Sequence, residues 1–227
     1  MRYLILLSLC SMLGFANITL NQKEFTVTKP IKSWIEFKNE NLTRQNYDYS
    51  CGSASLSTIL KYYYNLDISE KEILDTILES KGLQKEDKKE FEDGDMTLSF
   101  FDLAKYTKDK GFKAIGLALD LESLKKLKAP VILFVKIRKS EHFTIYKNMD
   151  KNYVYLADPN FGNIKVRISK FQEMFYQRED LKYPGKILAI IPVSNNQKEN
   201  IEQSFMNIQK SSNFVYENIK DKLSRVK

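Results

Sequence analysis

The feature that most constrains the fold is a change of hydrophobic period at Pro130. Before it, apolar residues recur at helical spacing, and after it they alternate as they do in strands. Helices followed by a run of strands predict an α+β fold with an antiparallel sheet, because parallel strands need a crossover between them. The expected helices are 51–64, a helix that begins at Ser69 with a capping box, and 97–110; the expected strands are 131–138, 142–147, 153–157, 164–168 and 187–193.

The first sixteen residues have the pattern of a secretory signal peptide. A basic Arg2 precedes a nearly unbroken apolar stretch at 3–13, and small residues stand before a cleavage position at Ala16. We therefore predict that 1–16 is a cleaved signal peptide and that the mature chain is periplasmic or otherwise exported; the alternative is a buried or anchoring helix. Cleavage would remove Cys10 and leave Cys51 as the single cysteine. Exported chains normally pair their cysteines, so Cys51 is either an inert buried thiol or a reactive nucleophile.

The charge and the hydropathy of the chain argue against nucleic-acid binding and against a membrane-spanning helix. The formal net charge of +7 is spread along the chain, whereas a nucleic-acid-binding domain usually carries a clustered basic stripe. The sequence has no apolar run of the roughly 18 residues that a membrane-spanning helix needs. We therefore expect neither a nucleic-acid partner nor a transmembrane span in the mature chain.

The segment after Val193 differs from the rest. Residues 194–227 contain neither Gly nor Pro, and their apolar residues fall at helix-compatible intervals: Ile201, Phe205, Ile208, Val215 and Ile219. We predict a C-terminal helical tail at 194–227. The sequence leaves open whether this tail packs on its own domain or docks on a partner or a membrane surface.

Cys51 stands where a loop enters the first expected helix, directly before Gly52. Backbone N–H groups without partners and the positive end of the helix dipole favour a thiolate at such a position. Gln45 lies six residues earlier. Its side-chain amide, together with the backbone N–H of Cys51, would form a pair of donors aimed at a developing oxyanion.

His142 opens one expected strand, and Asp158 ends the next at an Asp-Pro turn. Adjacent antiparallel strands would bring these two side chains together. Taken singly, the histidine is a structural residue and the aspartate a turn residue; the order Gln, Cys, His, Asp is what indicates chemistry. One Cys, one His and one carboxylate without paired spacing do not predict a metal site, and we expect no cofactor.

These segments resemble peptidase family C39, papain-like cysteine proteases best known for cutting double-glycine leader peptides during bacteriocin export. In that family a Gln stands six residues before a Cys-Gly at a helix start, and the Asp of an Asp-Pro turn follows the His by sixteen residues. Four residues of this chain match both spacings: Gln45, Cys51, His142 and Asp158. The resemblance covers roughly 43–193 and implies a papain-like peptidase domain at 17–193, with N-terminal helices packed on an antiparallel sheet.

The resemblance also implies roles for these residues. Cys51 would be the nucleophile and His142 the general base and acid. Asp158 would orient the imidazole, and Gln45 would complete the oxyanion hole. The substrate would be an exported polypeptide or a leader peptide.

Family members that are fused to exporters carry a membrane domain and an ATPase, and the sequence has neither the spans nor a phosphate-binding loop motif. The chain is therefore similar to the stand-alone, exported members that accompany secreted functional-amyloid subunits, with a secretion-system component as a further expected partner. Two alternatives stay open. One is another papain-like amidase or transglutaminase-type enzyme, and the other is a non-catalytic module that binds exported polypeptides.

Overall fold

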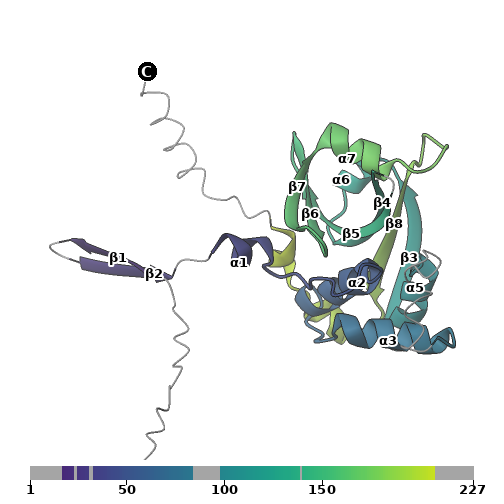
Figure 1. Cartoon of the computed structure of the whole chain (residues 1–227), viewed down its shortest axis with the longest axis horizontal. Coiled ribbons are helices and arrows are strands. Elements are labelled where there is room, and N and C mark those ends of the chain that lie inside the picture. Colours follow the sequence, from purple (N-terminus) through teal and green to yellow (C-terminus); the bar gives the residue numbers. More distant parts are fainter. Residues whose placement is uncertain (1–16, 23–24, 31–32, 84–97, 139, 208–227) are drawn as a thin grey trace, which may run out of the picture. The chain divides into compact units, whose positions relative to one another are not determined.

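The computed structural model describes residues 17–22, 25–30, 33–83, 98–138 and 140–207 (Figure 1). The chain divides into two compact units, Met1–Lys38 and Asn39–Lys227. The first unit contains an antiparallel hairpin of β1 (Asn17–Gln22) and β2 (Phe25–Pro30), followed by the short helix α1 (Trp34–Lys38). The predicted signal peptide lies outside the described residues, and so its cleavage stays a prediction.

The second unit is built on a six-stranded sheet in the order β3-β8-β4-β5-β6-β7, and every neighbouring pair is antiparallel. Helices α2, α3 and α5 precede most of the strands, so the predicted α+β fold is confirmed. The strands are β3 (Phe112–Leu119), β4 (Val131–Ile137), β5 (Ser140–Met149), β6 (Tyr153–Asp158), β7 (Gly162–Arg167) and β8 (Gly185–Pro192). The helices are α2 (Cys51–Tyr62), α3 (Glu70–Ser80), α5 (Phe100–Asp109), α6 (Leu121–Lys125), α7 (Ile168–Phe175) and α8 (Asn195–Glu199).

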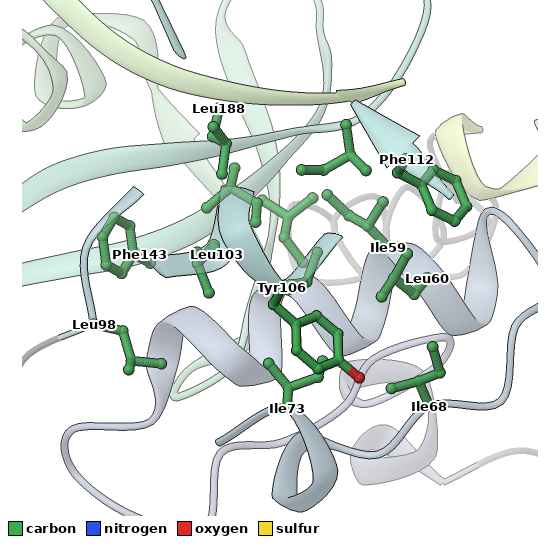
Figure 2. Close-up of a cluster of buried hydrophobic side chains, with 14 of the residues drawn as sticks. Ile59, Leu60, Ile68, Ile73, Leu98, Leu103, Tyr106, Phe112, Phe143 and Leu188 are labelled. Carbon is green, nitrogen blue, oxygen red and sulfur yellow. The ribbon is translucent and has the colours of Figure 1, made fainter. Parts of the chain in front are cut away.

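Two apolar clusters cover the two faces of this sheet. The first lies between the sheet and helices α2, α3 and α5, and Figure 2 shows Ile59 and Leu60 of α2 within it. The second lies under α7, which is on the other side of the sheet in Figure 1. Neighbouring residues of β4 enter different clusters, Ile132 the first and Leu133 the second. A strand buried on both faces is expected to behave in this way, because successive side chains point to opposite sides.

The helix ends follow the capping residues, with one difference from the sequence prediction. Ser69 caps α3 by accepting from the Glu72 N–H at 3.1 Å. The Glu72 carboxylate does not complete the expected box, because it accepts instead from Lys110 at 2.8 Å and from the Tyr106 hydroxyl at 3.2 Å. The full capping box forms at α5, which therefore begins after Ser99 rather than at residue 97.

Three elements of the second unit were not predicted from the sequence: β3, α6 and α7. Strand β3 contains Gly116 and two alanines, which weaken its strand signal, and it pairs with β8, far along the chain. Helix α7 buries Phe171, Met174 and Phe175 within only eight residues. So short an apolar run gives no clear period.

The described part of the C-terminal tail packs on the second unit. It forms α8 and a 3-10 turn at Gln203–Met206 rather than one continuous helix. The Phe205 side chain is 1% exposed and lies 6.1 Å from the Tyr63 ring, and the Glu202 N–H donates to the Tyr63 carbonyl at 2.8 Å. Phe205 therefore belongs to the domain core, with Ile201 and Met206 packed against it, whereas 208–227 lie outside the described residues.

Within the described ranges, none of the helices combines the length and the apolar character that crossing a bilayer would require.

Candidate active site

Cys51 is the first residue of α2, in the position that the sequence predicts. A tight turn precedes it: the Tyr47 N–H donates to the Ser50 hydroxyl oxygen at 3.1 Å, and the hydroxyl donates back to the Tyr47 carbonyl at 2.8 Å. Because the Ser50 side chain is used in this turn, it does not cap the helix. The first N–H groups of a helix have no partner within it, so the partly exposed, unpaired thiol of Cys51 lies beside free donors.

His142 and Asp158 meet at the neighbouring end of the sheet. Strands β5 and β6 pair with Ile145 opposite Ala157, and this register places the His142 Nε2 atom 2.9 Å from the Asp158 Oδ2 atom. The His142 side chain is 11% exposed and the Asp158 side chain 1%. Burial removes competing water from this hydrogen bond, which strengthens it.

The second carboxylate oxygen of Asp158 is also occupied. Oδ1 accepts from the backbone N–H groups of Asn160 at 2.9 Å and Phe161 at 2.8 Å. This is the geometry of an Asx turn, in which an aspartate side chain replaces a backbone acceptor. The turn after β6 therefore holds the carboxylate in a fixed orientation and aims Oδ2 at the imidazole.

The two charges stabilise each other. Burial disfavours the imidazolium, but the hydrogen bond and charge of Asp158, together with the nearby Cys51, outweigh it and raise the pKa of His142 to about 9. Burial likewise disfavours the carboxylate, and the hydrogen bond and charge of His142 hold the pKa of Asp158 below its usual value. At neutral pH the pair is therefore an imidazolium and a carboxylate.

The hydrogen bond to Asp158 uses one nitrogen of the ring. Nε2 is bonded to Asp158, so Nδ1 is the nitrogen that remains for another group, and Cys51 is near enough to raise the pKa of His142. The first residue of α2, the imidazole on β5 and the carboxylate at the end of β6 are thus grouped in one place. A thiol and an imidazole that lie near each other can exchange a proton.

Gln45 lies in the loop before α2 and is fastened to the Asp-Pro turn. Its backbone N–H donates to the Pro159 carbonyl at 3.1 Å. Its side-chain Nε2 donates to the Tyr47 carbonyl at 3.1 Å, and its buried Oε1 accepts no hydrogen bond from the described residues. An amide nitrogen carries two N–H groups, so the bond to Tyr47 uses one of them and leaves the other available to a ligand.

Aromatic side chains border this site. The Phe161 ring is 42% exposed and meets the His142 ring edge to face at 6.2 Å. A Cβ atom at Gly52 would lie 3.2 Å from the Phe143 ring and 3.3 Å from the Leu98 Cβ, so glycine allows α2 to approach β5 closely. Sequence reasoning missed Phe161, because a residue three places after the aspartate carries no signal of its own.

The four residues singled out in the sequence therefore lie on two sides of one site. His142 and Asp158 are hydrogen-bonded, Cys51 lies near enough to His142 to raise its pKa, and Gln45 is tied to the turn that carries Asp158. Their catalytic roles stay predictions. Within the described part of the chain no three His, Cys, Asp or Glu side chains are grouped to hold a metal ion.

The comparisons with known proteins agree on one family. A family model described as the Peptidase C39 family matches residues 39–178. A protein of Pseudomonas fluorescens named "Probable functional amyloid protease FapD" is 30% identical over 149 residues, which are 64% of this chain and 61% of that protein. The sublancin-168-processing and transport ATP-binding protein SunT of Bacillus subtilis is 28% identical over 138 residues, 59% of this chain and 17% of that protein. The match to FapD thus spans about three fifths of that relative's length.

Among solved structures, a double glycine motif protease from an AMS/PCAT transporter in complex with its leader peptide is 23% identical. The alignment covers 66% of this chain and 90% of that chain, with a TM-score of 0.49.

Proposed function

The chain belongs to the peptidase C39 family, and from this premise we propose that it is a cysteine peptidase that cleaves an exported polypeptide or leader peptide. The observation that carries the proposal is the grouping of Cys51 with the hydrogen-bonded pair of His142 and Asp158. A thiol, a base and a residue that orients the base are what nucleophilic acyl transfer requires. A module that only binds polypeptides would not require these three side chains to lie together.

In the first step, the Cys51 sulfur attacks the carbonyl carbon of the scissile peptide bond. A C–S bond forms, and the carbonyl oxygen takes the negative charge. The backbone N–H of Cys51 and the free N–H of the Gln45 amide donate to this oxyanion. His142 gives its proton to the departing amine nitrogen, the C–N bond breaks, and a thioester remains on Cys51.

In the second step, water replaces the amine. His142, now neutral, takes a proton from the water as its oxygen attacks the thioester carbonyl. The C–S bond breaks, and the Cys51 thiolate pairs again with the His142 imidazolium. The product leaves as a carboxylic acid, which loses its proton to the solvent. Asp158 keeps Nδ1 of the ring toward the sulfur through both steps, and its charge stabilises the imidazolium.

The names of two relatives support the proposed substrate class. One relative is named as a functional amyloid protease and another as a sublancin-processing protein. We propose a substrate of the same kind, a polypeptide that is exported through a secretion or functional-amyloid system. The export of this chain, predicted from residues 1–16, would bring it to such a substrate in the periplasm.

The proposal is tested with the purified chain and the exported polypeptides encoded beside its gene. Wild-type protein should cleave one of them at a defined bond, seen by mass spectrometry. Cys51→Ala should cleave none, and it should retain the substrate as a stable complex. Cys51→Ser is a matched control that keeps the shape of the side chain. Serine supplies a hydroxyl nucleophile but forms no thiolate.

Two results would contradict this proposal. Binding without cleavage by the wild-type protein would favour a binding module. Transfer of the acyl group to an amine instead of to water would favour a transglutaminase-type enzyme, since the thioester is common to both reactions.

A further inference from the structure

Two acidic side chains are almost completely buried among the described residues, and the proposed chemistry uses only one of them. Asp158 is 1% exposed and Glu70 is 2% exposed. Glu70 is the first residue of α3 and therefore lies on a different element from His142 and Asp158. A buried carboxylate is costly unless donors satisfy it, so its partners indicate what it holds in place.

Among the described residues, the hydrogen-bond donors to the Glu70 side chain come from one residue. Its Oε1 atom accepts from the backbone N–H of Asn46 at 2.9 Å, and its Oε2 atom accepts from the side-chain amide of the same asparagine. Asn46 directly follows Gln45. A charged acceptor on a backbone N–H is roughly twice as strong as a neutral one, and it restrains the peptide unit that joins Gln45 to Asn46.

Three consecutive residues of this loop are anchored on two opposite supports. The Arg44 guanidinium donates to the Asn160 carbonyl, and the Gln45 N–H donates to the Pro159 carbonyl at 3.1 Å. Both of those bonds reach the turn after β6, whereas the Asn46 bonds reach α3. Gln45 thus lies between two fixed points, while its own side chain has one hydrogen bond to protein, to Tyr47.

We propose that Glu70 is a positioning residue for Gln45: the Glu70–Asn46 contact sets the direction of the Gln45 backbone and so aims its free amide N–H at the oxyanion. The inference rests on the proposed role of Gln45 in peptide cleavage. Glu70 touches neither substrate nor nucleophile, and its effect passes through the loop. A misplaced donor fails to stabilise the oxyanion even when the nucleophile is intact.

The test compares two reactions of Cys51. Glu70→Met removes both acceptors at similar volume, and Glu70→Gln keeps an acceptor for the Asn46 N–H. We expect Glu70→Met to lower kcat for peptide cleavage about tenfold with little change in KM, and Glu70→Gln to restore most of it. Alkylation of Cys51 by iodoacetamide should proceed at the wild-type rate, because displacement at a saturated carbon forms no oxyanion.

A double variant separates a positioning role from a structural one. If Glu70 acts through Gln45, Glu70→Met should cost nothing further in a Gln45→Ala background. Glu72→Met is the matched control on the same helix, since Glu72 contacts Lys110 and Tyr106 rather than the loop. This control should leave both reactions of Cys51 unchanged.

A readout without catalysis keeps the inference testable if the proposed peptidase activity fails. The Gln45 side-chain amide can be followed by NMR in protein labelled with ¹⁵N-glutamine and assigned by its loss in Gln45→Ala. Its resonances should shift or broaden in Glu70→Met and stay in place in Glu72→Met. If Glu70→Met does not fold, Asn46→Ala, which removes the side-chain bond alone, should shift the same resonances.

Unchanged Gln45 resonances in the folded variants would overturn the inference whether or not the protein cleaves peptides. So would an equal loss of cleavage and alkylation, or an additive loss in the double variant, since either result would mean that Glu70 supports the fold in general.

Discussion

The two buried carboxylates hold opposite sides of the same site in different ways. Asp158, at the end of β6, contacts the imidazole directly with one oxygen and the backbone of its own turn with the other. Glu70, at the start of α3, directs both oxygens to Asn46 and reaches the site only through the loop. The side chains are similarly buried, so burial alone does not distinguish their roles.

The difference lies in what each carboxylate controls. Asp158 fixes both the orientation and the charge of the imidazole, which in the proposed mechanism transfers protons, so we expect its loss to change which nitrogen of His142 carries a proton. Glu70 fixes only the path of a backbone segment, so its loss changes a direction by a small amount. Effects on activity should therefore be far larger on the sheet side of the site than on the α3 side.

The largest effect should come from His142→Ala, which removes the group that Asp158 supports. Peptide cleavage should fall at least about a thousandfold, because no other described group is placed to move the proton. Cleavage rates and circular dichroism measure the loss of activity and the retention of fold. A folded His142→Ala variant with more than a few per cent of the wild-type activity would contradict this comparison. The side of the site that carries His142 and Asp158 would then not have the larger effect on cleavage.

The next largest effect should come from Asp158→Asn. Its single carbonyl oxygen cannot serve both the imidazole and the two turn N–H groups. If the oxygen faces the turn, the amide N–H₂ faces Nε2 and forces the wrong tautomer of the ring. We expect a loss of about a hundredfold or more in cleavage, against about tenfold for Glu70→Met. Equal losses in these two variants would show that the two carboxylates act alike.

A titration sharpens the comparison without any substrate. His142 is the only histidine of the chain, so its NMR signal titrates without overlap. The wild-type pKa should lie near 9, and it should fall in Asp158→Asn and in Cys51→Ala because each removes a partner that raises it. Glu70→Met should leave it unchanged. A fall in that variant as large as in Asp158→Asn would mean that α3 controls the charge of the site as well as its shape.

The same pKa fixes the sign of a stability change. The folded-state pKa of His142 lies above its ordinary value of 6.5, so the pair stabilises the native state fully below about pH 6.5 and loses this contribution as pH rises through about 9. The lowered pKa of Asp158 acts at the other end, where stability is lost as pH falls through that value. Urea unfolding at several pH values measures both changes in the free energy of unfolding. In His142→Ala, this free energy should change less with pH in the alkaline range.

The smallest effect on activity should come from Phe205→Ala, which lies on neither side of the site. Removing this buried ring should lower the free energy of unfolding by about 3–5 kcal/mol, while the folded fraction keeps its cleavage rate. Phe101→Ala is the matched control, because that ring is 76% exposed and should cost little. Truncation after Asn195 should destabilise the domain for the same reason. An unchanged melting temperature would show instead that residues 201–206 are peripheral.

The sequence determined the order of α2, α3 and α5 and of strands β4 to β8, and the position of Cys51, because these depend on local patterns. The 3.6-residue period, the capping serines and the alternation after Pro130 act over a few neighbouring residues. Local sequence signals also place two of the four matched residues: Cys51 at a helix start and Asp158 before a proline. The residue spacings supplied the family resemblance.

Only the tertiary structure decided which distant segments meet. The pairing of β3 with β8, the return of Phe205 to the core beside Tyr63, and the contact of Glu70 with Asn46 join residues that no local pattern connects. Glu70 looks in the sequence like any acidic residue in the first turn of a helix, where acidic residues are favoured and usually solvated. Packing of α3 against the loop buries it, and burial is what makes a single pair of hydrogen bonds decide the direction of Gln45.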